Sequence, residues 1–147
     1  MSKGDVVVDD HLLLRVLLGD EPPALRQHGG QLSTTGLWYH RLCRALADTT
    51  VVGTMSRSLG NIDDQAAARV IGAVTMLPDT IGLASLRTLA WPMAALIEAG
   101  ARLNLMSLEA LAAARHLDAT ICLAEADDNR PLVEVAGHHD VVVRVIA

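Results

Sequence analysis

The amino-acid sequence predicts a three-layer α/β/α domain with a central, mostly parallel β-sheet. Its 147 residues are enough for one domain built around one hydrophobic core. Hydrophobic residues make up 51% of the chain and charged residues 20%, which is the composition of a globular protein rather than a disordered one. Short apolar runs alternate with segments of helical pattern, and this alternation is typical of a parallel sheet covered by helices.

The predicted strands are short and apolar, as strands buried on both faces of a parallel sheet are. Val6–Val8 is a β-branched run stopped by Asp9 and Asp10, and it predicts the first strand. Further strands are expected at residues 31–35, 120–124 and 141–146.

Helices are expected where capping or breaking residues bracket an apolar helical pattern. Ser107 is a suitable N-cap for one helix, and Gly100 is a natural residue just past the end of another. Pro92 lies in an apolar stretch and predicts either a helix start or a kink. The expected helices cover residues 12–18, 37–47, 65–74, 94–99, 108–117 and 131–135.

Charge and aromatic content restrict the function. The net charge is −5 and Lys3 is the only lysine, so the chain lacks the overall basic surface of nonspecific nucleic-acid binders. Eleven arginines remain that could line a local groove. The three aromatic residues Trp38, Tyr39 and Trp91 are too few for a base-stacking platform. We expect the two tryptophans to be core or interface anchors.

The cysteines and the N-terminus predict an intracellular location. Cys43 and Cys122 each lie in an apolar stretch without a CxxC or Cys/His ligand spacing, which favours buried reduced thiols over a zinc site. Residues 1–5 contain no apolar signal segment, and no apolar run reaches membrane length. We therefore expect a cytoplasmic protein without a membrane partner.

Acidic residues follow two of the predicted strands. Asp9 and Asp10 come directly after the first strand, Asp127 and Asp128 follow a later one, and Glu109 lies in the first turn of the helix before it. Ligands bind beyond the carboxyl ends of parallel strands, so these acids are expected at one edge of the sheet. Clustered carboxylates suit Mg²⁺ or Mn²⁺, which activates water and stabilises phosphoryl charge. Turn geometry and the helix dipole also place acids at such positions without any metal.

Four segments together resemble the PIN-domain nuclease family. VVDDHLL at residues 7–13 is similar to the opening strand that delivers the family's first catalytic Asp, and LSTTGLWYHRL at 32–42 to its second strand and helix. LMSLEALAAA at 105–114 resembles the segment with a later acid, and ICLAEAD at 121–127 the strand and turn with the last acid. The nearest subgroup is the VapC-type toxins, small endoribonucleases that are paired with an antitoxin.

The resemblance implies a single PIN-like domain over the whole chain, with Asp9, Glu109 and Asp127 as catalytic residues. Together with Asp128 they would hold Mg²⁺ or Mn²⁺, and Glu109 would either ligate the metal or orient the attacking water.

The acidic set is incomplete by the family's pattern. Tyr39, with His40 beside it, stands where the family has a Glu in its second helix, and Glu109 replaces an Asp. Two functions stay open. One is a Mg/Mn-dependent endoribonuclease of toxin–antitoxin type, weakened by the lost ligand. The other is a catalytically inactive PIN-like domain that acts as an interaction or dimerisation module.

The resemblance also implies partners. These are an RNA substrate, a cognate antitoxin and a second copy of the chain, because toxin relatives form pairs and Ala/Leu-rich helices offer an apolar face. Arg15, Arg41 and Arg44 lie on helices that would flank the site, where they could hold RNA phosphates or an acidic antitoxin tail.

A response-regulator receiver domain shares the opening apolar run and paired acids, but the rest of its pattern is missing. It needs a phosphoacceptor Asp near residues 50–56, where this chain has no acid, and a late lysine, which Lys3 is not.

Overall fold

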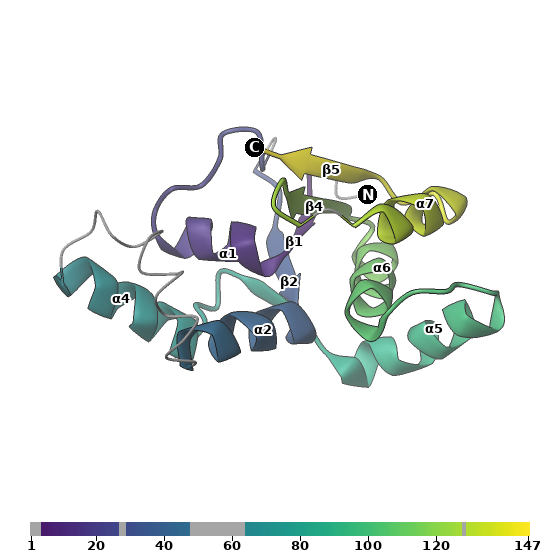
Figure 1. Ribbon diagram of the computed structural model, residues 1–147, viewed down its shortest axis with the longest axis horizontal. Coiled ribbons are helices and arrows are strands. Elements are labelled where there is room, and N and C mark those ends of the chain that lie inside the picture. Colours follow the sequence, from purple (N-terminus) through teal and green to yellow (C-terminus); the bar gives the residue numbers. More distant parts are fainter. Residues whose placement is uncertain (1–3, 27–28, 48–63, 128) are drawn as a thin grey trace.

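Five parallel strands form the central layer, in the order β3-β2-β1-β4-β5. This computed structural model describes residues 4–26, 29–47, 64–127 and 129–147 (Figure 1). The strands are β1 (Val6–Val8), β2 (Leu32–Thr35), β3 (Gly82–Ala84), β4 (Thr120–Ala124) and β5 (Val143–Ile146).

The strand order reverses next to β1. The chain builds β1, β2 and β3 toward one edge of the sheet, and then crosses back to add β4 and β5 on the other side of β1. Val7 of β1 therefore lies opposite Ser33 of β2 and Ile121 of β4. Open parallel sheets bind ligands at such a switch point, beyond the carboxyl ends of the strands. Asp9 lies at this place because it directly follows β1.

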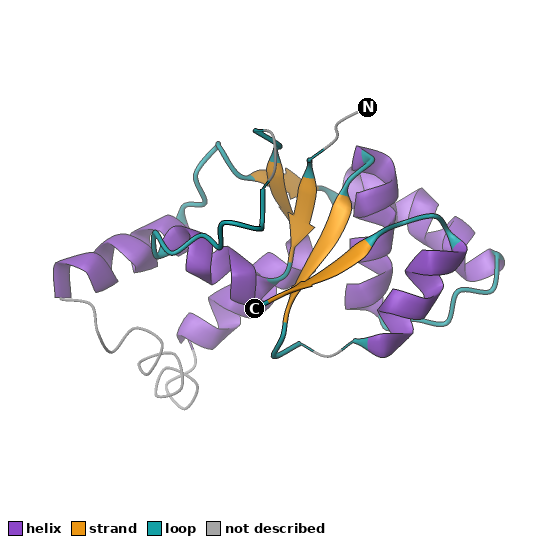
Figure 2. Cartoon of the chain, turned by 90° about the horizontal axis from the view of Figure 1, so that it is seen from above, coloured by secondary structure: helices purple, strands orange, loops and turns teal. Residues whose placement is uncertain are grey.

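Helices cover both faces of the sheet, which confirms the predicted three-layer α/β/α arrangement (Figures 1 and 2). None of the helices in the described part of the chain is long and apolar enough to cross a membrane. One face carries α1 (Asp10–Leu17), α2 (Gly36–Ala47) and α4 (Asp64–Thr75), and the other carries α5 (Leu86–Glu98), α6 (Leu105–Leu117) and α7 (Arg130–His138).

The core is divided by the sheet into two halves, because successive side chains of a strand point to opposite faces. Val6 and Val8 pack with the residues of α1, whereas Val7 packs on the other side with Leu111 of α6. Trp38, in the first turn of α2, is 1% exposed and packs with the half of the core that contains residues of α5, α6 and α7. It is therefore a core anchor, as its size predicts.

Three features differ from the sequence-based expectations. α6 begins at Leu105 and is capped by Asn104, whose side chain accepts a hydrogen bond from the Ser107 N–H at 2.8 Å, so Ser107 is inside the helix rather than its cap. α5 continues through Pro92, held by apolar residues buried along its inner face. The edge strand β3 is a short Gly-Leu-Ala segment that is only partly buried, and it was not predicted.

Candidate acidic site

Asp9 joins the ends of β1 and β4. Its Oδ1 caps α1 by accepting a hydrogen bond from the Leu12 N–H at 2.9 Å, and its Oδ2 accepts one from the Ala124 N–H at 2.9 Å. The residue is completely buried. This burial raises the pKa of Asp9 to about 6, although the two backbone hydrogen bonds act in the opposite direction.

Arg41 of α2 binds two other carboxylates of the same edge. Its Nε and Nη2 donate to Asp10 Oδ2 and Oδ1, both at 2.6 Å, and Nη2 also donates to Asp127 Oδ2 at 3.1 Å. The Asp10 side chain is 9% exposed and the Arg41 side chain 37%. The hydrogen bonds that Arg41 donates to Asp10 raise the pKa of Arg41 above its ordinary value. Asp10, which follows β1, and Asp127, which follows β4, thus both bind the guanidinium of Arg41.

Glu109 of α6 contacts the start of α2. Its Oε1 accepts a hydrogen bond from the Leu37 N–H at 2.8 Å, and the residue is fully buried. Its Oε2 accepts no hydrogen bond from any described residue. Gly36 leaves space beside this oxygen, since a Cβ there would lie 3.7 Å from Oε2. A buried carboxylate oxygen without a partner is a place for a proton or a cation.

The predicted site residues do not all meet. Within the described ranges, one group of three possible ligands has its donor atoms within 4.8 Å of one another, and it consists of Asp9, Asp10 and His11. This group could hold a metal ion. Glu109 and Asp127 are outside it, although Asp127 shares Arg41 with Asp10.

Sequence reasoning counted Asp10 among the clustered acids without naming it as a metal ligand, and it gave His11 no ligand role. Their adjacency to Asp9 was the available signal, because the first turn of a helix after a buried strand keeps neighbouring side chains close. Asp128 lies outside the described residues.

Tyr39, which stands where the resemblance predicts a Glu, is turned to another element. Its hydroxyl donates a hydrogen bond to the Val74 carbonyl oxygen at 2.6 Å and so links α2 to α4. The neighbouring His40 is exposed. Tyr39 therefore contributes to helix packing rather than supplying an oxygen ligand to the acidic edge.

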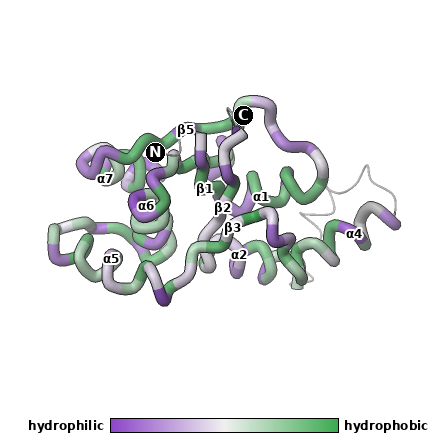
Figure 3. The backbone as a smooth tube through the Cα atoms, turned by 180° about the vertical axis from the view of Figure 1, so that it is seen from behind, coloured by the Kyte–Doolittle hydropathy of each residue, from purple (hydrophilic) through white to green (hydrophobic). Residues whose placement is uncertain are grey.

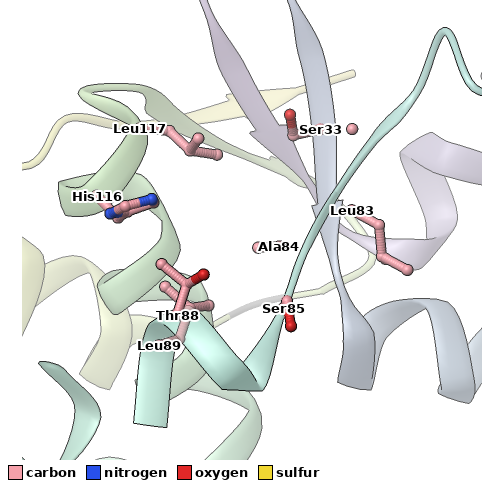
Figure 4. Close-up of a pocket in the computed structure, with 9 residues that line it drawn as sticks. Ser33, Leu83, Ala84, Ser85, Thr88, Leu89, His116 and Leu117 are labelled. Carbon is pink, nitrogen blue, oxygen red and sulfur yellow. The ribbon is translucent and has the colours of Figure 1, made fainter. Parts of the chain in front are cut away.

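A separate hollow of about 220 Å³ lies beside β3, between α5 and the end of α6 (Figure 4). Its polar groups include the hydroxyls of Ser33 and Thr88 and the ring of His116. No carboxylate lines it, so it is not part of the acidic site.

Fold and site together define a parallel α/β protein with a carboxylate–arginine cluster at the switch point of its sheet. No protein-family model matches the chain, and a search of curated proteins finds no match either. The resemblance to PIN domains therefore stays a prediction.

Proposed function

We propose that the protein is a PIN-like, Mg²⁺- or Mn²⁺-dependent endoribonuclease of toxin–antitoxin type. The observation that carries this proposal is the convergence of acids from two neighbouring strands at the switch point, where Asp10 and Asp127 contact the same nitrogen of Arg41. Parallel α/β proteins place their ligand sites there, and carboxylates in that position suit hard divalent cations.

The residues present fit such a cation. Asp9, Asp10 and His11 form the compact ligand group. Both oxygens of Asp9, and Oδ2 of Asp10, accept a single hydrogen bond each and keep a further lone pair, whereas Oδ1 of Asp10 accepts two hydrogen bonds. Glu109 of α6 lies outside this group, and its Oε2, which accepts no hydrogen bond from the described residues, is a further oxygen that suits a cation. A bound divalent cation would supply an activated water and stabilise charge on a phosphoryl group.

Arg41 is the residue that would bind the substrate. A guanidinium binds a phosphate through the same two-pronged hydrogen bonding that it uses with a carboxylate. Arg41 is partly exposed, and Arg44 is exposed one turn further along α2. Arg15 is instead engaged with Asp20 and with the carbonyl oxygen of Ala147. We assign the RNA backbone, or the acidic tail of an antitoxin, to the Arg41 and Arg44 side of α2.

A specific observation favours the second candidate, an inactive domain that serves as an interaction module. Arg41 already forms hydrogen bonds to both Asp10 and Asp127, and both oxygens of Asp9 accept backbone hydrogen bonds. In that case the acids and Arg41 form a structural network that holds α2 against the strand ends.

Cleavage of a mixed RNA by the purified protein, with Mn²⁺ or with EDTA, separates the two candidates. Asp10→Asn and Asp127→Asn are better variants than a change of Asp9, whose loss also removes the link between β1 and β4. Asp118→Asn is the matched control, because Asp118 is exposed at the other end of β4. Mn²⁺-dependent cleavage lost in the first two variants and kept in the control supports the nuclease. Absence of cleavage by the folded wild-type protein supports the interaction module.

A further inference from the structure

Helix α5 exposes a largely apolar surface to solvent. Trp91 is 83% exposed, Leu86 52% and Ile97 58%, and Arg87 and Glu98 are the only charged residues among its 13. Figure 3 shows α5 mostly in the colours of hydrophobic and neutral residues. An exposed tryptophan on an apolar helix is typical of a protein–protein contact surface, where Trp is a frequent anchor.

Four exposed residues of α5 are spaced symmetrically, so that their spacing is the same counted from either end of the helix. Arg87, Trp91, Ala94 and Glu98 are all exposed and are spaced by four, three and four positions. This spacing puts them on one side of the helix, as in the seam of two packed helices. The pattern has its centre between Pro92 and Met93, so it places the basic end of one helix against the acidic end of an identical antiparallel helix.

We propose that this face of α5 binds a second copy of the chain, with the two helices antiparallel about a twofold axis. In this register Arg87 of one copy faces Glu98 of the other, and this pair occurs twice. Trp91 faces Ala94 of the other copy, so a large side chain meets a small one. A twofold interface requires such self-complementarity of charge and shape.

A groove beside the seam has room for the indole of Trp91 from the other copy. It lies between α5 and α6, has a volume of about 340 Å³, and is lined by Pro92, Ala95, Leu96, Ala112, Arg115 and His116. Ala95 adjoins Ala94 on the helix, so the groove begins next to the position that Trp91 of the other copy faces.

This interface is independent of the acidic site, and the test does not use catalysis. Sedimentation equilibrium of the full chain should show a dimer for the wild-type protein. Arg87→Glu and Glu98→Arg each bring like charges together, and each should weaken the dimer at least about tenfold. Trp91→Ser should weaken it as well. Arg102→Glu, an exposed charge outside the seam, is the control and should leave the dimer unchanged.

An equimolar mixture of the Arg87→Glu and Glu98→Arg proteins provides the sharpest result. Each mixed pair again has opposite charges at both contacts, so the mixture should form a heterodimer although neither variant dimerises alone. Circular dichroism checks that the variants are folded, which is expected because the changed side chains are exposed. A monomeric wild-type protein, a dimer insensitive to all three substitutions, or a mixture that stays monomeric would each overturn the proposal.

Discussion

The guanidinium of Arg41 links Asp10 and Asp127 by three hydrogen bonds, so that one cation from α2 serves the carboxyl ends of both β1 and β4. Asp10 is almost buried and Asp127 is 22% exposed in its side chain. A divalent cation at this edge would compete with Arg41 for the same oxygens. The ion pair and the metal are therefore alternatives whose balance can be measured.

Replacing Arg41 should expose that competition. Arg41→Gln keeps a polar, unbranched side chain but removes the guanidinium and leaves two acids without their cation, which should lower the free energy of unfolding by about 2 kcal/mol at neutral pH. Mn²⁺ should then raise the melting temperature of Arg41→Gln more than that of the wild-type protein. Urea unfolding and thermal melts measure both effects. Arg44→Gln, on the exposed part of the same helix, should behave like wild type, and an equal response to Mn²⁺ in all three proteins would contradict the prediction.

The stability of the protein should fall between about pH 4 and pH 6 because of Asp9. Its pKa is raised from the ordinary 3.8 to about 6, so in this interval the folded state binds a proton that the unfolded state has released. Protonated Asp9 makes its full contribution to the free energy of unfolding below pH 4. As the pH rises to 6, the free energy of unfolding should fall by roughly 2–3 kcal/mol because this contribution is lost. Above pH 6 to 7 it no longer changes.

Asp9→Asn isolates this contribution, since an amide does not titrate. The measured quantity is the difference in unfolding free energy between wild type and Asp9→Asn, obtained from urea curves at several pH values. As the pH rises from 4 to 6, the unfolding free energy of the wild-type protein should decrease relative to that of Asp9→Asn. A difference that is flat across the interval would show that Asp9 titrates normally.

Two substitutions of Glu109 should separate the effect of its hydrogen bond to the Leu37 N–H from the effect of its charge. Glu109→Gln keeps an oxygen for the Leu37 N–H and replaces an oxygen that accepts no hydrogen bond from the described residues, so stability should stay within about 1 kcal/mol of wild type or rise. Glu109→Ala loses the hydrogen bond and leaves a cavity, and should cost about 2 kcal/mol or more. Chemical denaturation of both variants tests this. A loss with Gln as large as with Ala would mean that the second oxygen has a partner of its own.

Gly30 should tolerate no side chain. A Cβ at this position would overlap the Gly4 carbonyl group, and because both contacting atoms belong to the backbone, neither can move aside cheaply. Gly30→Ala should therefore destabilise the protein by more than about 2 kcal/mol. Gly137→Ala is the matched control, because Gly137 is exposed in α7 with nothing within 4 Å of the added atom. It should stabilise by about 0.5–1 kcal/mol, and equal effects of the two changes would contradict the expectation.

The buried strands of the centre were predictable, and the edge strand was not. β1 and β4 match the expected residues at both ends because each is buried on both faces and reads as a continuous apolar run. β3 has the sequence Gly-Leu-Ala and is only partly buried. Its pairing with β2 stabilises it, and its own three residues do not predict a strand. For the same reason α5 passes Pro92, because burial of its inner face outweighs the local cost of proline.

The sequence by itself determined the three-layer class, the position of the central strands and the presence of acids just past their ends, because apolar patterning and turn chemistry are local properties of the sequence. Only the tertiary structure decided what those acids contact. Arg41 is 31 positions from Asp10 and 86 from Asp127, and Glu109 is 72 positions from the Leu37 N–H that it binds. Such pairs are set by the crossover connections between the parallel strands. Those connections depend on how the whole chain buries its apolar surface, and they produce no periodic pattern in the sequence around any one residue.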